Sequence, residues 1–205
     1  STQQETLFPY TTLFRSAHCL TACEHFVQLT LKDALLRMAQ TGLTLYRQLA
    51  TNGQAPDKQH ELRLLNWLGS AYEALDMTQA LRVYRQALDA SLAQGARDKA
   101  IIAATGLGYI HANLSQFDEA EAVLQQAQDL AQQLGDMRMQ YRVLRTQAVL
   151  ASMRYESALA RDLRLQADAI VMALNDPLLI SENKRELARA YYQTGDVQRA
   201  EATIV

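Results

Sequence analysis

The stretch "QFDEAEAVLQQAQDLAQQLG", residues 116–135, has the periodicity of an amphipathic helix that ends at a glycine. Its apolar residues follow the i, i+3, i+4, i+7 pattern and are Ala120, Val123, Leu124, Ala127, Leu130, Ala131 and Leu134. The opposite face carries Glu and Gln and is expected to face solvent. Gly135 can adopt the left-handed backbone geometry that commonly ends a helix. The stretch therefore predicts a helix with one face packed against a partner.

The glycine at the end of this stretch has counterparts at a nearly constant step. A glycine or asparagine directly follows a helical pattern at four points: Gly53, Gly95, Gly135 and Asn175. The intervals are 42 (95 − 53), 40 (135 − 95) and 40 (175 − 135) residues. Because Gly and Asn both tolerate left-handed geometry, this recurrence predicts an internal repeat of about 40 residues.

Small residues mark the same repeat at a second point. Each follows a short polar break, at Ala80, Ala120, Ala158 and Ala200. The intervals are 40 (120 − 80), 38 (158 − 120) and 42 (200 − 158) residues. A small side chain lets two helices approach closely, so each unit is predicted to be a helix, a tight turn and a second helix.

Composition agrees with a helical, folded chain. The 205 residues are 49% hydrophobic and 20% charged, and only 8 are Gly and 3 Pro, which favours long helices over strands and turns. The formal charge of −2 provides no global basic field, so no direct nucleic-acid partner is expected. No apolar run approaches the roughly 20 residues that span a bilayer. We therefore expect no membrane span.

Three segments carry a recognisable motif. They are "LGSAYEALDMTQALRVYRQAL" (68–88), "LGYIHANLSQFDEAEAVLQQA" (107–127) and "LARAYYQTGDVQRA" (187–200). A degenerate unit surrounds "QAVLASMRYESAL" (147–159), and a divergent one is expected at residues 18–52, with "KDALLRMAQTGLTLYRQLA" as its second helix. These residues resemble the tetratricopeptide repeat family, in a variant with longer helices. The resemblance implies an all-α, right-handed superhelical array of antiparallel helix pairs, with about four and a half hairpins in residues 17–205.

The resemblance also implies a ligand-binding groove. In this family the first helix of each hairpin lines a concave surface, and the matching positions here are Arg63, Asn66, Ser70, Thr105, Tyr109, Arg142, Arg145, Arg185, Arg189 and Tyr192. Glu73, Ala112, Val149, Ser152 and Glu182 share the same stripes. Four of the arginines come from the last two units, and guanidinium groups pair well with carboxylates. The hypothesis is an acidic or C-terminal-carboxylate peptide as ligand; the alternative is that the arginines are solvated or paired with Glu182 and Glu186.

Catalytic and metal-binding patterns are weak in this sequence. "AHCLTACEHF" (17–26) contains His18, Cys19, Cys23 and His25, but His25 points away from the helical face that carries the cysteines. Two buried structural cysteines are therefore favoured over a zinc site. Nucleophile elbows, phosphate-binding glycine loops and kinase signatures are absent from the sequence. We expect no catalytic residue, cofactor or metal, and no enzymatic activity.

The leading functional prediction is a protein–protein interaction scaffold that binds a peptide or partner domain in the groove. The alternative is an N-terminal sensory or regulatory repeat segment of a larger bacterial signalling protein. "ALNDPLLISENKRELARAYYQTGDVQRA" (173–200) is similar to the last repeats before the catalytic domain of repeat-bearing diguanylate cyclases. Related arrays occur in histidine kinases and large transcription activators. The coding sequence after Val205 distinguishes the two hypotheses.

The two ends of the chain suggest a fragment. "TLFPYTTLFRS" (6–16) is similar, at every position, to the translation of a common short-read sequencing adapter, so residues 1–16 are interpreted as a non-native, unstructured leader. The chain has no initiator Met and stops within a helical pattern at "RAEATIV". A truncated repeat array exposes an apolar end, so self-association is expected. A cytoplasmic location is expected, although a targeting signal in a preceding segment would change it.

Overall fold

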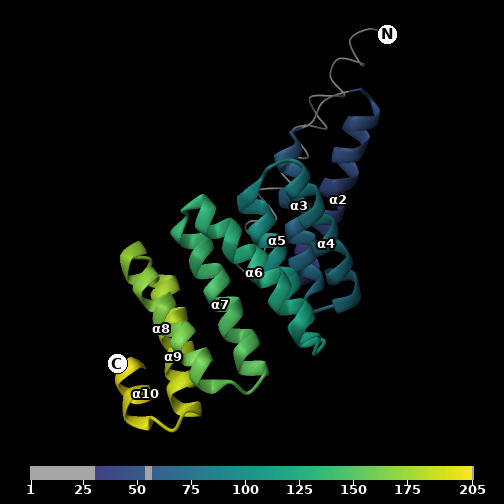
Figure 1. The fold of residues 1–205 in the computed structure, drawn as a ribbon. Helices are drawn as coiled ribbons and strands as arrows, with labels where there is room; N and C mark the ends of the chain where they lie inside the picture. Colours follow the sequence, from purple (N-terminus) through teal and green to yellow (C-terminus); the bar gives the residue numbers. More distant parts are fainter. Residues whose placement is uncertain (1–30, 54–56, 205) are drawn as a thin grey trace. The chain divides into compact units, whose positions relative to one another are not determined.

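The computed structural model describes residues 31–53 and 57–204. Within these ranges every regular element is an α-helix, as predicted (Figure 1). The helices are α2 (Lys32–Thr51), α3 (Lys58–Tyr72), α4 (Met77–Ala93), α5 (Arg97–Asn113), α6 (Phe117–Leu134), α7 (Met137–Met153), α8 (Ser157–Leu174), α9 (Pro177–Gln193) and α10 (Val197–Ile204). The leader, the His/Cys cluster and the first helix of the divergent unit lie outside the described residues. The second helix predicted for that unit is α2.

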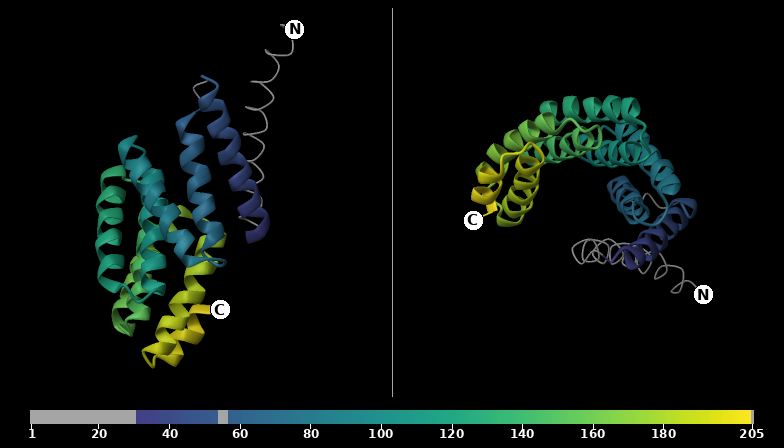
Figure 2. Two further views of the ribbon diagram at one scale, coloured as in Figure 1. Left: turned by 90° about the vertical axis from the view of Figure 1, so that its right-hand side faces the viewer. Right: turned by 90° about the horizontal axis from the view of Figure 1, so that it is seen from below.

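Two compact units make up the chain, one up to Ala103 and one from Ala104, so the boundary falls inside α5. In the first unit α3 packs against α2 and α4. In the second unit α7 packs against α6 and α8, and α9 against α8 and α10. Consecutive helices run antiparallel within each unit (Figure 2). None of the described helices is both long and apolar enough to cross a membrane.

The residues predicted to end helices do adopt left-handed geometry. The backbone angle φ is +75° at Gly53, +66° at Gly95, +68° at Gly135 and +51° at Asn175. The turns inside the hairpins use the same device at a 40-residue step (155 − 115, 195 − 155), with φ of +59° at Ser115, +63° at Tyr155 and +84° at Gly195. Tyrosine is an unusual residue in this region because its Cβ crowds the following carbonyl.

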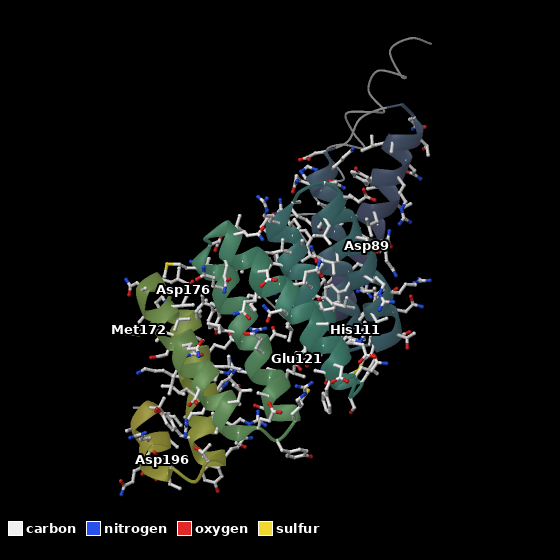
Figure 3. The ribbon with its side chains drawn as sticks, viewed as in Figure 1. Asp89, His111, Glu121, Met172, Asp176 and Asp196 are labelled. Carbon is white, nitrogen blue, oxygen red and sulfur yellow. The ribbon has the colours of Figure 1, made fainter. Side chains whose placement is uncertain are left out.

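The start of several helices is fixed by an aspartate. Side-chain oxygens of Asp57, Asp76, Asp136 and Asp176 accept backbone N–H groups from the first turns of α3, α4, α7 and α9. Such caps satisfy donors that have no partner within the helix. Asp196 accepts the N–H of Arg199 in α10 at 3.1 Å. Figure 3 shows Asp176 and Asp196 at opposite ends of α9.

One predicted repeat marker is wrong. Ala80, Ala120 and Ala200 are buried, but Ala158 is exposed and Ala160 is the buried residue, 1% accessible. With Ala160 the intervals become 40 (120 − 80), 40 (160 − 120) and 40 (200 − 160) residues. Residues two apart on a helix project about 200° apart, so only one alanine of the pair can face α7. The period is thus regular even in the degenerate unit.

The core of the second unit is a series of small clusters between helices. One contains Ala112, Ala120, Leu124 and Leu150, with Phe117 and Met153 against it. Another contains Tyr141, Ala167 and Val171, and a third contains Leu187, Tyr191 and Ala200. A chain of local cores is what stacked hairpins produce, since each hairpin buries its apolar face on its neighbours.

Candidate binding surface

In the first unit, the predicted groove residues are largely engaged by the protein itself. The guanidinium carbon of Arg63 lies 5.2 Å from the centroid of the Trp67 ring. Ser70 accepts a hydrogen bond from Lys32 Nζ at 3.1 Å on its hydroxyl, and its carbonyl accepts another at 3.0 Å. Asn66 is buried, and its Nδ2 donates to the carbonyl of Lys99 at 3.3 Å. Contrary to the prediction, Asn66 therefore offers no free surface.

In the second unit, α5 contributes less than predicted. Thr105 is buried, with only 2% of its surface accessible, so its hydroxyl is not available to a ligand. Tyr109 is half-buried. His111, labelled in Figure 3, lies at the end of the same helix and is also buried. Its Nδ1 lies 2.7 Å from Gln116 Oε1. Such a partner explains a buried histidine without a catalytic role.

The arginines of α7 form cross-links to α9. Arg138 Nη1 lies 2.9 Å from Asp176 Oδ2, and Arg145 Nη1 lies 2.6 Å from Glu182 Oε1. The Arg138 hydrogen bond lowers the pKa of the Asp176 carboxyl. Arg142, one turn before Arg145, is half-buried. Of the predicted groove arginines on this helix, Arg145 is paired with Glu182, which matches the alternative that the sequence left open.

The predicted residues of α9 form the most accessible stripe. The side chains of Arg185 and Arg189 are 73% and 71% exposed, and Tyr192 is 69% exposed. Leu178, on the same helical face, is 82% exposed. Glu186 is the acidic neighbour of both arginines, at 3.4 Å from Arg185 Nε and 3.9 Å from Arg189 Nη1. Exposed ion pairs of this length are weak and leave most guanidinium donors available.

A buried polar layer lies between α7, α8 and α9. Arg164 of α8 is only 5% exposed, and its Nη1 has no hydrogen-bond partner. Burial lowers the pKa of this guanidinium, while Glu186 opposes that shift. Burial likewise raises the pKa of the Tyr141 phenol, whose oxygen also has no partner. Asn183 Nδ2 donates to Asp168 Oδ1 at 3.1 Å and to the Arg164 carbonyl at 3.3 Å.

Sequence reasoning missed Arg164, although the repeat contains a signal for it. Tyr84, Leu124 and Arg164 are spaced by 40 residues (124 − 84, 164 − 124), and all three are buried. The first two pack over the glycines of the preceding helix, Gly69 and Gly108. Arg164 is therefore a charged residue at a repeat position that holds a tyrosine or a leucine in the two preceding repeats. This difference is visible in the sequence and indicates the buried polar layer.

Comparison with known proteins agrees with this architecture. Residues 103–134 match the family described as "Tetratricopeptide repeat". No curated protein sequence matches the chain.

Solved structures with a similar fold include BtubC (BKLC) from P. vanneervenii, with 20% identity, a TM-score of 0.68 and coverage of 96% of this chain and 88% of that one. A second comprises the nearly identical TPR-like repeats of a Podosopora anserina putative kinesin light chain, with 17% identity, a TM-score of 0.60 and coverage of 93% and 92%. The apo form of RapI has 10% identity, a TM-score of 0.66 and coverage of 94% and 81%. The chain thus has a TPR-like helical repeat fold, which is typical of protein-interaction scaffolds.

Proposed function

We propose that this chain is a non-catalytic protein-interaction scaffold that binds an acidic peptide segment, or a C-terminal carboxylate, along α9. The observation that carries the proposal is the exposed stripe of Arg185, Arg189 and Tyr192. Two guanidinium groups one turn apart present planar forks of donors that match carboxylates, and the tyrosine ring adds apolar contact beside them. The fold supports the scaffold part of the proposal, because stacked hairpins present extended surfaces.

The binding arginines are fewer than the sequence suggested. Arg145 of α7 forms an ion pair with Glu182 of α9, so its role in this proposal is to hold α7 and α9 together. Arg185 and Arg189 share one carboxylate, Glu186, at long distances. A ligand carboxylate therefore competes with Glu186 for the two guanidinium groups, and it does not have to break a short ion pair. Glu186 acts as an internal competitor that sets the affinity for an external acid.

The test is binding of a fluorescein-labelled peptide of five glutamates with a free C-terminus, measured by anisotropy at low and high salt. An Arg185→Ala/Arg189→Ala variant is expected to weaken binding at least about tenfold, since hydrogen bonds to charged groups contribute about 1.5–3 kcal/mol each. Glu186→Gln is expected to strengthen binding. Arg161→Ala, an arginine of α8 paired with Asp162, is the matched control. Equal losses in the control and the double variant would refute the proposal.

A second candidate is that the array is the regulatory segment of a larger signalling protein. This candidate is motivated by the resemblance of residues 173–200 to repeats that precede catalytic domains. It is compatible with the same α9 surface, whose ligand is then another domain of the protein. The coding sequence downstream of Val205 tests it: a cyclase, kinase or DNA-binding domain supports this candidate, and a stop codon opposes it.

A further inference from the structure

A cavity of about 230 Å³ lies in the second unit, between α6, α7 and α8. Helix α7 packs against both α6 and α8 (Figure 1), and each of the three helices contributes lining residues. Glu121, labelled in Figure 3, belongs to the α6 wall, and Leu159 belongs to the α8 wall. No lining residue comes from α9, so this cavity is distinct from the arginine stripe.

The cavity wall combines two kinds of side chain. Its apolar part consists of Leu124, Leu144, Leu150, Ala151, Leu159 and Leu163. Its polar part includes Gln125, Gln128, Gln147 and Gln166. Each glutamine amide carries both donors and an acceptor, as a peptide group does, so amides beside leucines suit a polypeptide main chain with an aliphatic side chain.

The size of the cavity favours a side chain over a free small molecule. Pockets for drug-sized ligands usually have volumes of about 300–1,000 Å³, and this cavity is smaller. Leu159 lines the cavity and is 48% exposed, so it offers apolar surface to a ligand. Gln147 Nε2 donates to Gln128 Oε1 at 2.8 Å, which links the α7 and α6 parts of the lining. An aliphatic side chain held on a peptide can therefore enter beside Leu159 and bury apolar surface there.

Charged residues beside the cavity determine which kind of residue can adjoin the aliphatic one in a bound peptide. Arg154 Nη1 lies 2.8 Å from Glu121 Oε2, and its Nη2 lies 3.5 Å from Asp118 Oδ1. The same guanidinium lies over the Phe117 ring, 5.6 Å from its centroid. The charged residues of the cavity lining are Glu121, Glu156 and Arg154, which together have a net charge of −1 (1 − 2). An acidic rim attracts a basic side chain.

We propose that this cavity docks a peptide segment in which a leucine-sized aliphatic residue adjoins a lysine or arginine. The aliphatic side chain fills the leucine-lined cavity and the peptide groups meet the glutamine amides. The basic side chain lies against Glu156 and the acidic end of α6. The chain then has two binding surfaces of opposite charge preference, one on α9 for acids and one between α6 and α8 for bases.

The experiment uses three labelled, acetylated and amidated dodecapeptides in a serine background. The first contains Leu-Lys pairs, the second replaces each Lys with Gln, and the third replaces each Leu with Ser. We expect the first peptide to bind and each replacement to weaken binding about tenfold or more. A first peptide that binds no better than the other two overturns the proposal.

Two exposed variants locate the binding of the first peptide. Leu159→Ser is expected to weaken it about tenfold or more, and Glu156→Gln to weaken it about three- to fivefold, as expected for loss of one partly exposed charge pair. Arg185→Ala/Arg189→Ala is expected to leave it unchanged, which separates this proposal from the acidic-peptide proposal. Unchanged affinity in both cavity variants overturns it. Self-association that Leu159→Ser abolishes also overturns it, because the occupant is then a second copy of the chain.

Discussion

Gly108 of α5 lies directly under Leu124 of α6, and a Cβ atom at Gly108 would be 2.8 Å from Leu124 Cγ. Leu124 is 1% exposed and cannot move away without disturbing its cluster. Gly108→Ala is therefore expected to lower the free energy of unfolding by about 1–3 kcal/mol, the usual range for overpacking, although alanine favours helix. Urea denaturation measures this. Ala122→Gly, at an exposed position of α6, controls for helix propensity, and a stabilised Gly108→Ala variant would contradict the packing.

Tyr155 combines a φ of +63° with 92% exposure, so its side chain gains little from the fold while its backbone is strained. The equivalent turn between α9 and α10 has Gly195 with φ of +84°. Tyr155→Gly is expected to stabilise the protein by about 1 kcal/mol, because left-handed geometry costs an L-residue roughly 1–2 kcal/mol. The thermal melting temperature should rise. Gly195→Ala is the reciprocal variant and should lower it, so equal effects of the two changes would contradict the explanation.

Arg164 occupies a core position, where only 5% of its surface is exposed and its Nη1 has no hydrogen-bond partner. Arg164→Met keeps the length of the side chain and removes a buried charge, so it is expected to increase the free energy of unfolding by about 1 kcal/mol or more. Leu165→Met, at an exposed site on the same helix, should be nearly neutral. A destabilised Arg164→Met variant would mean that the charge is well compensated, against the structure.

Asp176 gives the protein a specific dependence on pH. Its folded-state pKa is lowered, first by the Arg138 hydrogen bond, from an ordinary value of 3.8. The resulting stabilisation is fully present above pH 3.8 and is lost as the pH falls through the lower folded-state pKa. Asp176→Asn keeps a capping side chain but does not titrate, so the difference in urea midpoint between it and the parent should shrink as the pH falls below 3.8. Arg138→Gln should remove most of that pH dependence, and an unchanged profile would contradict the assignment.

Much of the fold could be predicted from the sequence because one physical device repeats. Gly95, Gly135 and Asn175 end helices by left-handed geometry, and glycine and asparagine are the residues that permit it. Tyr155 shows where this reasoning stops: it adopts the same geometry without a residue type that signals it. Ala158 shows a second limit of this reasoning. The choice between Ala158 and Ala160 as the buried alanine depends on which face of α8 packs on α7, and the sequence does not give that face.

The candidate surface could be predicted only in part. Helical spacing placed Arg185, Arg189 and Tyr192 on one stripe, and their exposure agrees with that placement. It did not indicate that Asn66 and Thr105 are buried, because burial depends on how neighbouring helices cover each face. The pairing of Arg145 with Glu182 was one of two alternatives, and distances between helices were needed to choose. The α6–α8 cavity arises from three helices and has no signature in any one of them.

Gly95 and Gly135 have nearly the same backbone angle φ, which affects how a repeat protein of this kind can gain or lose length. Each is followed by a new hairpin, with φ of +66° and +68°. A deletion of residues 96–135 therefore joins Gly95 to Asp136 with nearly the same φ that Gly135 now provides. Gene duplication or loss of one such segment, 40 residues long (135 − 95), thus adds or removes a whole hairpin without a new type of junction. Shorter insertions within a helix rotate every later side chain and are expected to be eliminated by selection.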